Sequence, residues 1–125
     1  MKLHHIALIC SDYSQSKRFY TDILGLEIIA EHYRAERQSY KLDLALNGVY
    51  LLELFSFPSP PPRVSQPEAC GLRHLAFEVA DPAQKRAELL ALGVDCEDLR
   101  QDEYTGKTFF FTRDPDGLPI EFYQE

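Results

Sequence analysis

The sequence predicts an α+β fold built from two successive β-α-β-β-β modules within one domain, residues 1–125. The first observation is that Gly71–Val79 is similar to the first nine residues, because each segment places a histidine just before a short apolar run. The second is a proline-rich segment at the midpoint of the chain. The third is a set of landmarks that recur after 68 or 69 residues: His5 and His74, Asp12 and Asp81, Gly25 and Gly93, Gly48 and Gly117, and Glu53 and Glu121. Several landmarks in one register indicate an internal duplication.

The first module covers residues 1–57. Lys2–Cys10 alternates between two faces, as a strand does. A helix is expected from Ser14, as N-cap, to Leu24, and Gly25 is expected to end it. Asn47-Gly48 is a strong signal for a hairpin turn. The remaining strands are expected at Leu26–Ala30, Ser39–Leu46 and Val49–Phe57.

Residues 58–70 are expected to connect the modules. Their prolines exclude regular structure and favour an extended, stiff chain. Proline runs also occur in ligands of SH3 domains, but this run lies at the midpoint of a repeat. A spacer between modules is therefore the favoured interpretation.

The second module covers residues 71–125 and repeats the order of the first. Leu72–Val79 is predicted to be a strand. Asp81 is expected to cap a helix at Ala83–Leu92, which Gly93 ends. The sequence Asp-Pro-Asp-Gly at 114–117 predicts a tight turn. The other strands are expected at Val94–Leu99, Lys107–Thr112 and Leu118–Tyr123.

The composition excludes several classes of function. A length of 125 residues with 45% hydrophobic side chains suits one domain with a real core. A net charge of −7 argues against nucleic acid or an anionic membrane as the main partner. The apolar run Ile6–Cys10 is too short for a signal peptide or a membrane span, so a cytoplasmic protein is expected. Three cysteines without C-x-x-C spacing argue against disulfides and a cysteine-rich zinc site.

The duplication places four potential metal ligands at matching positions. Each histidine belongs to the first strand of its module and each glutamate to the last: His5 and Glu53, then His74 and Glu121. The opposite faces of these strands are apolar and are expected to pack on the helices. The four side chains would then face the concave side of a curved sheet. Imidazole and carboxylate suit a divalent ion such as Ni, Zn, Co or Mn, whereas any one of these residues alone would more simply be solvated or satisfied in the core.

These motifs resemble the vicinal oxygen chelate superfamily, which includes glyoxalase I. The resemblance covers essentially the whole chain, and its most specific part is Asp114–Glu121, read as D-P-D-G-x-x-I-E. It implies two modules that form a cupped mixed sheet around a metal, with the helices outside. The other matching stretches are His5–Leu8, Leu51–Leu54 and His74–Phe77.

The resemblance favours glyoxalase-like chemistry within that superfamily. The ligand set His5, Glu53, His74 and Glu121 is similar to that of glyoxalase I. Related acyl-CoA epimerases usually carry glutamine in place of Glu53, ring-cleaving dioxygenases and fosfomycin-modifying enzymes use three protein ligands, and metal-free antibiotic-binding relatives lack the ligands. The implied reaction is isomerisation of a 2-oxoaldehyde–thiol hemithioacetal to a 2-hydroxyacyl thioester. Glu121 is the expected base, with Glu53 as the alternative.

The substrate is less well indicated than the reaction. The residues that contact glutathione in bacterial glyoxalase I proteins, an arginine after the first strand and an asparagine after the first glutamate ligand, are absent here. An anionic substrate could use Arg34, Arg37 or Lys107, each of which could equally be a solvated surface residue. An apolar wall of Phe55, Phe57, Phe109 and Phe111 suits another substrate. Glu78 shares a face with His74 without a predicted role.

Two other functions stay open at this point. One is a different metalloenzyme of the same superfamily, an epimerase or a dioxygenase. The other is a small-molecule-binding protein without catalytic activity, since a bound metal does not prove catalysis. The expected partner is in each case a small molecule, and the edges of an open sheet favour a homodimer. The sequence leaves open whether the two halves of one chain form the cup or halves from two chains pair.

Overall fold

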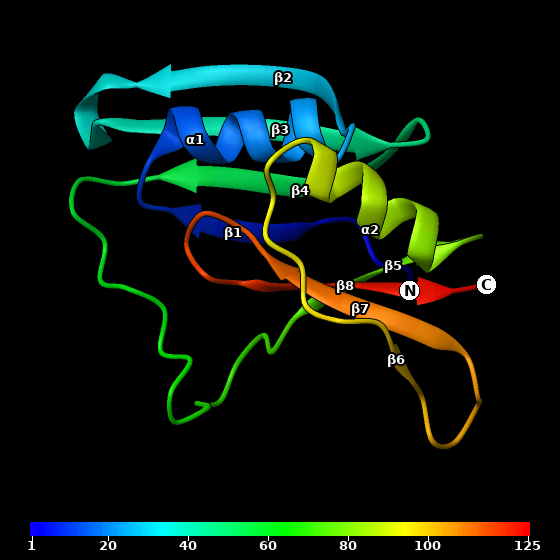
Figure 1. Cartoon of the computed structure of the whole chain (residues 1–125). Helices are drawn as coiled ribbons and strands as arrows, with labels where there is room; N and C mark the ends of the chain where they lie inside the picture. The colour runs from blue at the N-terminus through cyan, green and yellow to red at the C-terminus, as the bar shows by residue number, and fades with distance from the viewer. The chain divides into compact units, whose positions relative to one another are not determined.

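Each half of the chain forms a four-stranded mixed sheet with a helix packed on it. The computed structural model describes all residues from 1 to 125, and it divides into two units, Met1–Pro62 and Arg63–Glu125. The boundary between the units falls within the predicted connection, residues 58–70. Figure 1 shows the elements of both units. No helix in either unit has the length and apolar character that a membrane crossing requires.

The first unit contains one helix and four strands. Their bounds are β1 (Ile6–Cys10), α1 (Tyr13–Arg18), a π-helical turn η1 (Phe19–Ile23), β2 (Glu27–Arg34), a 3-10 turn η2 (Ala35–Arg37), β3 (Ser39–Leu46) and β4 (Val49–Ser56). The strand order is β1-β4-β3-β2, with β1 and β4 parallel and the other pairs antiparallel.

The second unit repeats this topology. Its elements are β5 (Leu75–Val79), α2 (Pro82–Ala91), β6 (Arg100–Gln101), β7 (Thr108–Arg113) and β8 (Pro119–Gln124). The strand order is β5-β8-β7-β6, again with the first pair parallel and the others antiparallel. The predicted α+β fold with two β-α-β-β-β modules is therefore confirmed.

Strand alternation separates a helix-facing core from the opposite face of each sheet. Helix α1 packs on β4, and α2 packs on β7 and β8. Most of the alternate residues that face the helices are buried, whereas Glu53 and Glu121 belong to the other face. The buried side chains include Leu42, Leu44, Leu52 and Leu54 in the first unit, and Leu89, Phe110, Ile120 and Phe122 in the second.

Four local predictions are corrected. Asp12, rather than Ser14, caps α1, because its carboxylate accepts the Gln15 N–H at 3.0 Å. Strand β2 continues to Arg34, beyond its predicted end at Ala30. Strands β1 and β5 begin one residue after His5 and His74.

The fourth correction concerns residues 94–99, which form no strand. The Glu97 N–H donates to the carbonyl of Phe111 at 2.8 Å, but the Thr112 hydroxyl donates to the Asp95 carbonyl at 2.6 Å. A hydrogen bond from the Thr112 side chain therefore replaces one of the backbone hydrogen bonds that would pair residues 94–99 with β7. The edge strand is reduced to the two residues of β6.

Glycines end both helices as predicted. Gly25 and Gly93 have φ values of +80° and +79°, which L-residues with side chains rarely adopt. The hairpin between β3 and β4 also has both turn residues in the left-handed region, Asn47 at +52° and Gly48 at +75°. This matches the type I′ turn that Asn-Gly favours.

Candidate metal centre

The first unit brings His5 and Glu53 together. Strands β1 and β4 are parallel, and Ala7 lies opposite Glu53. His5 precedes Ala7 by two residues, so its side chain leaves the same face of the sheet. His5 Nε2 lies 2.8 Å from Glu53 Oε2. Glu53 is only 9% exposed, which is unusual for a carboxylate.

The second unit brings His74 and Glu121 together by the same geometry. Ala76 lies opposite Glu121 on the parallel strands β5 and β8. His74 Nε2 lies 3.2 Å from Glu121 Oε2. The ring of Phe111 contacts the imidazole edge-on, with the centroids 5.3 Å apart. The duplication thus produces two equivalent His–Glu pairs, one in each unit.

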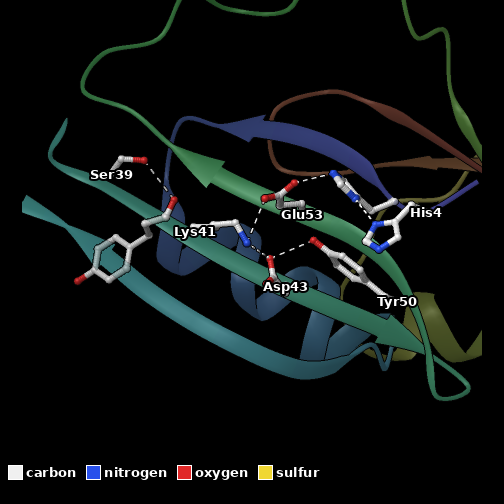
Figure 2. A network of polar contacts seen from close by, with 8 residues as sticks. His4, Ser39, Lys41, Asp43, Tyr50 and Glu53 are labelled. Carbon is white, nitrogen blue, oxygen red and sulfur yellow. Dashed lines mark hydrogen bonds and ion pairs between the residues drawn. The ribbon is translucent and has the colours of Figure 1, made fainter.

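The surroundings of the two pairs differ. In the first unit, the Lys41 ammonium lies 3.0 Å from Glu53 Oε1 and 2.6 Å from Asp43 Oδ1 (Figure 2). The Tyr50 hydroxyl donates to the same oxygen of Asp43 at 3.1 Å. Asp43 and Glu53 lie opposite each other on β3 and β4, so Lys41 compensates two adjacent carboxylates.

This network shifts the acid–base behaviour of its members. The hydrogen bond to Asp43, followed by that to Glu53, raises the pKa of the Lys41 ammonium above its usual value. Burial, followed by the hydrogen bond to Asp43, raises the pKa of Tyr50 to about 12. Lys41 therefore stays charged and Tyr50 stays protonated at neutral pH.

His4 contacts His5, although the alternation of a strand would place the two side chains on opposite faces. The two Nδ1 atoms lie 2.8 Å apart, so one ring donates and the other accepts. The Tyr50 ring stacks on His5, with the centroids 5.1 Å apart. His5 is thus oriented from both sides, as metal-ligating histidines usually are.

The donor atoms fit a divalent metal ion. Two ligands of one ion at about 2.1 Å, with an angle of 90–109° between them, lie about 3.0–3.4 Å apart. The separation of 3.2 Å in the second pair lies within this range, whereas the 2.8 Å in the first pair is the length of a direct hydrogen bond. Neutral imidazole and carboxylate are also the donors that Zn and Ni accept.

Neither unit by itself gathers three or more His, Cys, Asp or Glu side chains in a group that could hold a metal. The predicted site needs both pairs. Its assembly from His5, Glu53, His74 and Glu121 therefore stays a prediction.

A cavity of about 560 Å³ opens beside the second pair. His74 and Glu121 line it, together with Phe109 and Phe111 of β7. All its lining residues belong to the second unit, from Arg63 to Glu121. This unit therefore offers both candidate ligands and a space large enough for a small molecule.

The other predicted substrate residues lie outside this cavity. The Arg34 guanidinium lies over the Phe55 ring, 5.3 Å from its centroid, and Phe55 stacks with Phe57. Lys107 lies over the Tyr123 ring at 6.0 Å. The structure places Arg37 and Glu78 on the exposed surface.

Sequence reasoning did not connect Lys41, Asp43 and Tyr50 with Glu53. A regular two-residue hairpin at Asn47-Gly48 would set Asp43 opposite Leu52. A register shift at Leu44/Ala45 sets it opposite Glu53 instead. Such a bulge moves every following pair by one residue. The alternation of β3 could be predicted from the sequence, but the extra residue in β4 could not.

The comparisons with known proteins identify the family. The family model of the Glyoxalase/Bleomycin resistance protein/Dioxygenase superfamily matches residues 2–122. The chain is 57% identical to YaeR of Escherichia coli (strain K12), over 99% of this chain and 96% of that protein. It is 56% identical to YwkD of Bacillus subtilis (strain 168), over 98% and 96% of the two chains. Neither relative is assigned an activity.

Solved structures agree with this similarity. A glyoxalase family protein from Enterococcus faecalis is 44% identical, with a TM-score of 0.91 over 98% of this chain and 96% of that one. Glyoxalase I of Leishmania major, at 23% identity and a TM-score of 0.77, shares the fold over 100% of this chain and 87% of its own. Among the relatives found by sequence, a 2-epi-5-epi-valiolone epimerase from Actinomyces sp is 28% identical over 95% of this chain and 76% of that enzyme. The chain therefore belongs to the glyoxalase/bleomycin resistance protein/dioxygenase superfamily, the vicinal oxygen chelate proteins.

Proposed function

We propose that this protein is a metal-dependent enzyme of the glyoxalase I type, which converts a 2-oxoaldehyde–thiol hemithioacetal to a 2-hydroxyacyl thioester. The observation that carries the proposal is the pair of equivalent His–Glu contacts, at 2.8 Å in one unit and 3.2 Å in the other. His5, Glu53, His74 and Glu121 would hold one divalent ion, Ni, Zn, Co or Mn. The ion would supply Lewis-acid stabilisation of the negative charge that develops when a proton leaves carbon.

The contacts of the two glutamates support Glu121 as the base. Both oxygens of Glu53 are engaged, Oε2 by His5 and Oε1 by Lys41. Within its unit, Glu121 has His74 as its only ion-pair partner. Glu121 also lines the cavity, where a substrate would lie. A carboxylate with a free oxygen can take a proton from one substrate carbon and return it to the next, whereas Glu53 is better suited to hold its position.

The test is an isomerisation assay with separate control of metal content. The protein is stripped with a chelator, reloaded with Ni, Zn, Co or Mn, and mixed with methylglyoxal and a thiol: glutathione, coenzyme A, cysteine or bacillithiol. We expect thioester formation with at least one combination. Glu121→Gln should lower kcat by about 10²–10⁴-fold, as loss of a general base does. Glu78→Gln, which removes an exposed carboxylate outside the cavity, should leave kcat unchanged.

Absence of isomerisation by every metal-loaded form with every thiol would contradict the proposal. The metal content of Glu121→Gln, measured by atomic emission, separates loss of the base from loss of the ion.

The similarity to the valiolone epimerase favours a second candidate function, epimerisation beside a ketone. That reaction also removes a proton from carbon next to a carbonyl, so the same glutamate would act. Incubation with 2-epi-5-epi-valiolone in D₂O distinguishes the two candidates, because an epimerase would place deuterium on the carbon beside the carbonyl.

A further inference from the structure

The cavity beside His74 and Glu121 is lined by four arginines. They are Arg63, Arg73, Arg100 and Arg113. The chain as a whole carries a net charge of −7, so a concentration of guanidinium groups in one cavity runs against its overall charge. We propose that this cavity binds the anionic group of a small organic molecule, a carboxylate or a phosphate. That this molecule is the substrate rests on the proposed function.

The carboxylates in the cavity do not satisfy all four guanidinium groups. Arg100 and Arg113 share one partner, Glu97, at 3.0 Å and 4.0 Å. Arg73 contacts Glu68 at 2.9 Å. Each guanidinium has five N–H donors, so most donors of Arg73, Arg100 and Arg113 are left for a ligand. Glu121 also lines the cavity, so the cavity holds three carboxylates and four guanidinium groups.

Arg63 has a structural role in the same wall. It donates to the carbonyl oxygens of Leu72 and Arg73, at 2.7 Å and 2.9 Å, and to the Ser65 hydroxyl at 3.2 Å. These bonds join Arg63 to Leu72 and Arg73, so that the segment before β5 folds back on itself. They fix the side of the cavity from which Arg73 extends.

Arg100 is the best oriented of the anion-binding candidates. Its guanidinium lies over the rings of Phe109 and Phe111, 5.1 Å and 5.4 Å from their centroids. Stacking on aromatic rings fixes the guanidinium plane while its N–H edges stay available. A carboxylate or phosphate is the ligand that such a planar fork binds with two parallel hydrogen bonds.

The two phenylalanines also give the cavity an apolar side. Phe109 and Phe111 point away from the helix, whereas Phe110 between them is fully buried. In the register of the duplication they correspond to Lys41 and Asp43, because Phe111 lies opposite Glu121 as Asp43 lies opposite Glu53. At this position the first unit has a lysine that compensates the neighbouring carboxylates. The second unit has two phenylalanines instead, and they form an apolar surface beside the arginines. The expected ligand therefore has an anionic group attached to an apolar body.

The experiment measures binding of benzoate and its uncharged isostere benzamide to the full chain by isothermal titration calorimetry. The protein is first treated with EDTA, so that no metal contributes to the signal. We expect saturable binding of benzoate, at least tenfold weaker binding of benzamide, and a benzoate affinity that falls as salt rises. Arg100→Gln and Arg113→Gln should each weaken benzoate binding by at least fivefold.

Arg37→Gln is the matched control. It makes the same change of charge at an exposed arginine in the other unit, and should leave the benzoate affinity unchanged. Circular dichroism checks that each variant is folded. Inorganic phosphate, added as a competitor, distinguishes the two sources of the anion: competition assigns phosphate to the site, and no competition restricts the site to carboxylates.

Equal affinities for benzoate and benzamide would overturn the proposal, as would an equal loss of affinity in Arg37→Gln. The anion site and the proposed reaction can fail independently of each other. Benzoate binding through Arg100 without any isomerisation would keep the anion site and remove the reaction. Isomerisation with unchanged kcat/KM in Arg100→Gln would keep the reaction and remove the substrate role of the cavity.

Discussion

Lys41 is the residue that distinguishes the first His–Glu pair from the second. It contacts Glu53 and Asp43, whose side chains are 12% and 17% exposed. Two carboxylates opposite each other on neighbouring strands repel, and partial burial strengthens that repulsion. The ammonium removes the repulsion and holds Glu53 in place beside His5.

Replacement of Lys41 by methionine should therefore destabilise the metal-free protein. We expect a loss of about 1–3 kcal/mol, between the values for exposed and buried ion pairs, because both carboxylates stay behind without a partner. Urea unfolding of EDTA-treated protein at pH 7 measures the loss. Lys41→Arg keeps the charge and should lose less than half as much. A Lys41→Met variant as stable as the parent chain would show that the network does not contribute to stability.

At the scale of the elements, both helices begin at an aspartate, and the two caps differ in strength. Asp81 Oδ1 accepts two backbone N–H groups, from Ala83 at 2.9 Å and Gln84 at 3.0 Å. Asp12 accepts only that of Gln15. These bonds satisfy N–H groups that the first turn of a helix leaves unpaired.

Asp81→Ala should accordingly cost more stability than Asp12→Ala. Substitution of an N-cap by alanine costs about 0.5–2 kcal/mol, and we expect Asp81 near the upper value and Asp12 near about 1 kcal/mol. Guanidinium unfolding measures both. Asp81→Asn keeps an oxygen acceptor and should recover most of the loss. The reverse order of the two alanine variants would contradict this account of the caps.

The elements also show where sequence reasoning succeeds and fails. The order of elements, the glycine stops and the Asn47-Gly48 turn depend on local residue types, and all were predictable. The predicted N-cap of α1, Ser14, lies two residues after the observed N-cap, Asp12. Residue type alone does not separate them, because serine and aspartate are equally good N-caps. The bulge between β3 and β4 and the short β6 depend on tertiary contacts. Lys41 could therefore not be linked to Glu53, nor Arg100 to the cavity, from the sequence.

At the scale of the whole molecule, the duplication gives each unit one His–Glu pair, and the proposed function requires both pairs. His5 and Glu53 belong to the first unit, and His74 and Glu121 belong to the second. Each pair alone offers two donors, whereas tightly held Zn or Ni ions usually have three or four protein ligands. The two pairs could combine within one chain or between two chains of the predicted homodimer, and both arrangements stay predictions.

If one ion binds to both pairs, the stabilisation of the folded chain by that ion should depend on each of the two histidines. At a free ion concentration a thousandfold above its dissociation constant, a bound ion stabilises the folded chain by about 4 kcal/mol. The melting temperature should then rise by roughly fifteen degrees. His5→Ala and His74→Ala should each remove most of this rise, although the two histidines lie in different units. Differential scanning calorimetry with Zn or Ni, against EDTA, measures the rise.

The double variant decides between one site and two. In a shared site, removal of the second histidine adds little to the loss caused by the first, because the two residues act on one ion. Two independent sites would instead leave about half of the rise in each single variant and none in the double. His32→Ala serves as the control, because His32 lies exposed on β2 outside both pairs. Additive losses would therefore show that the duplicated pairs bind separately, and the common site would be wrong.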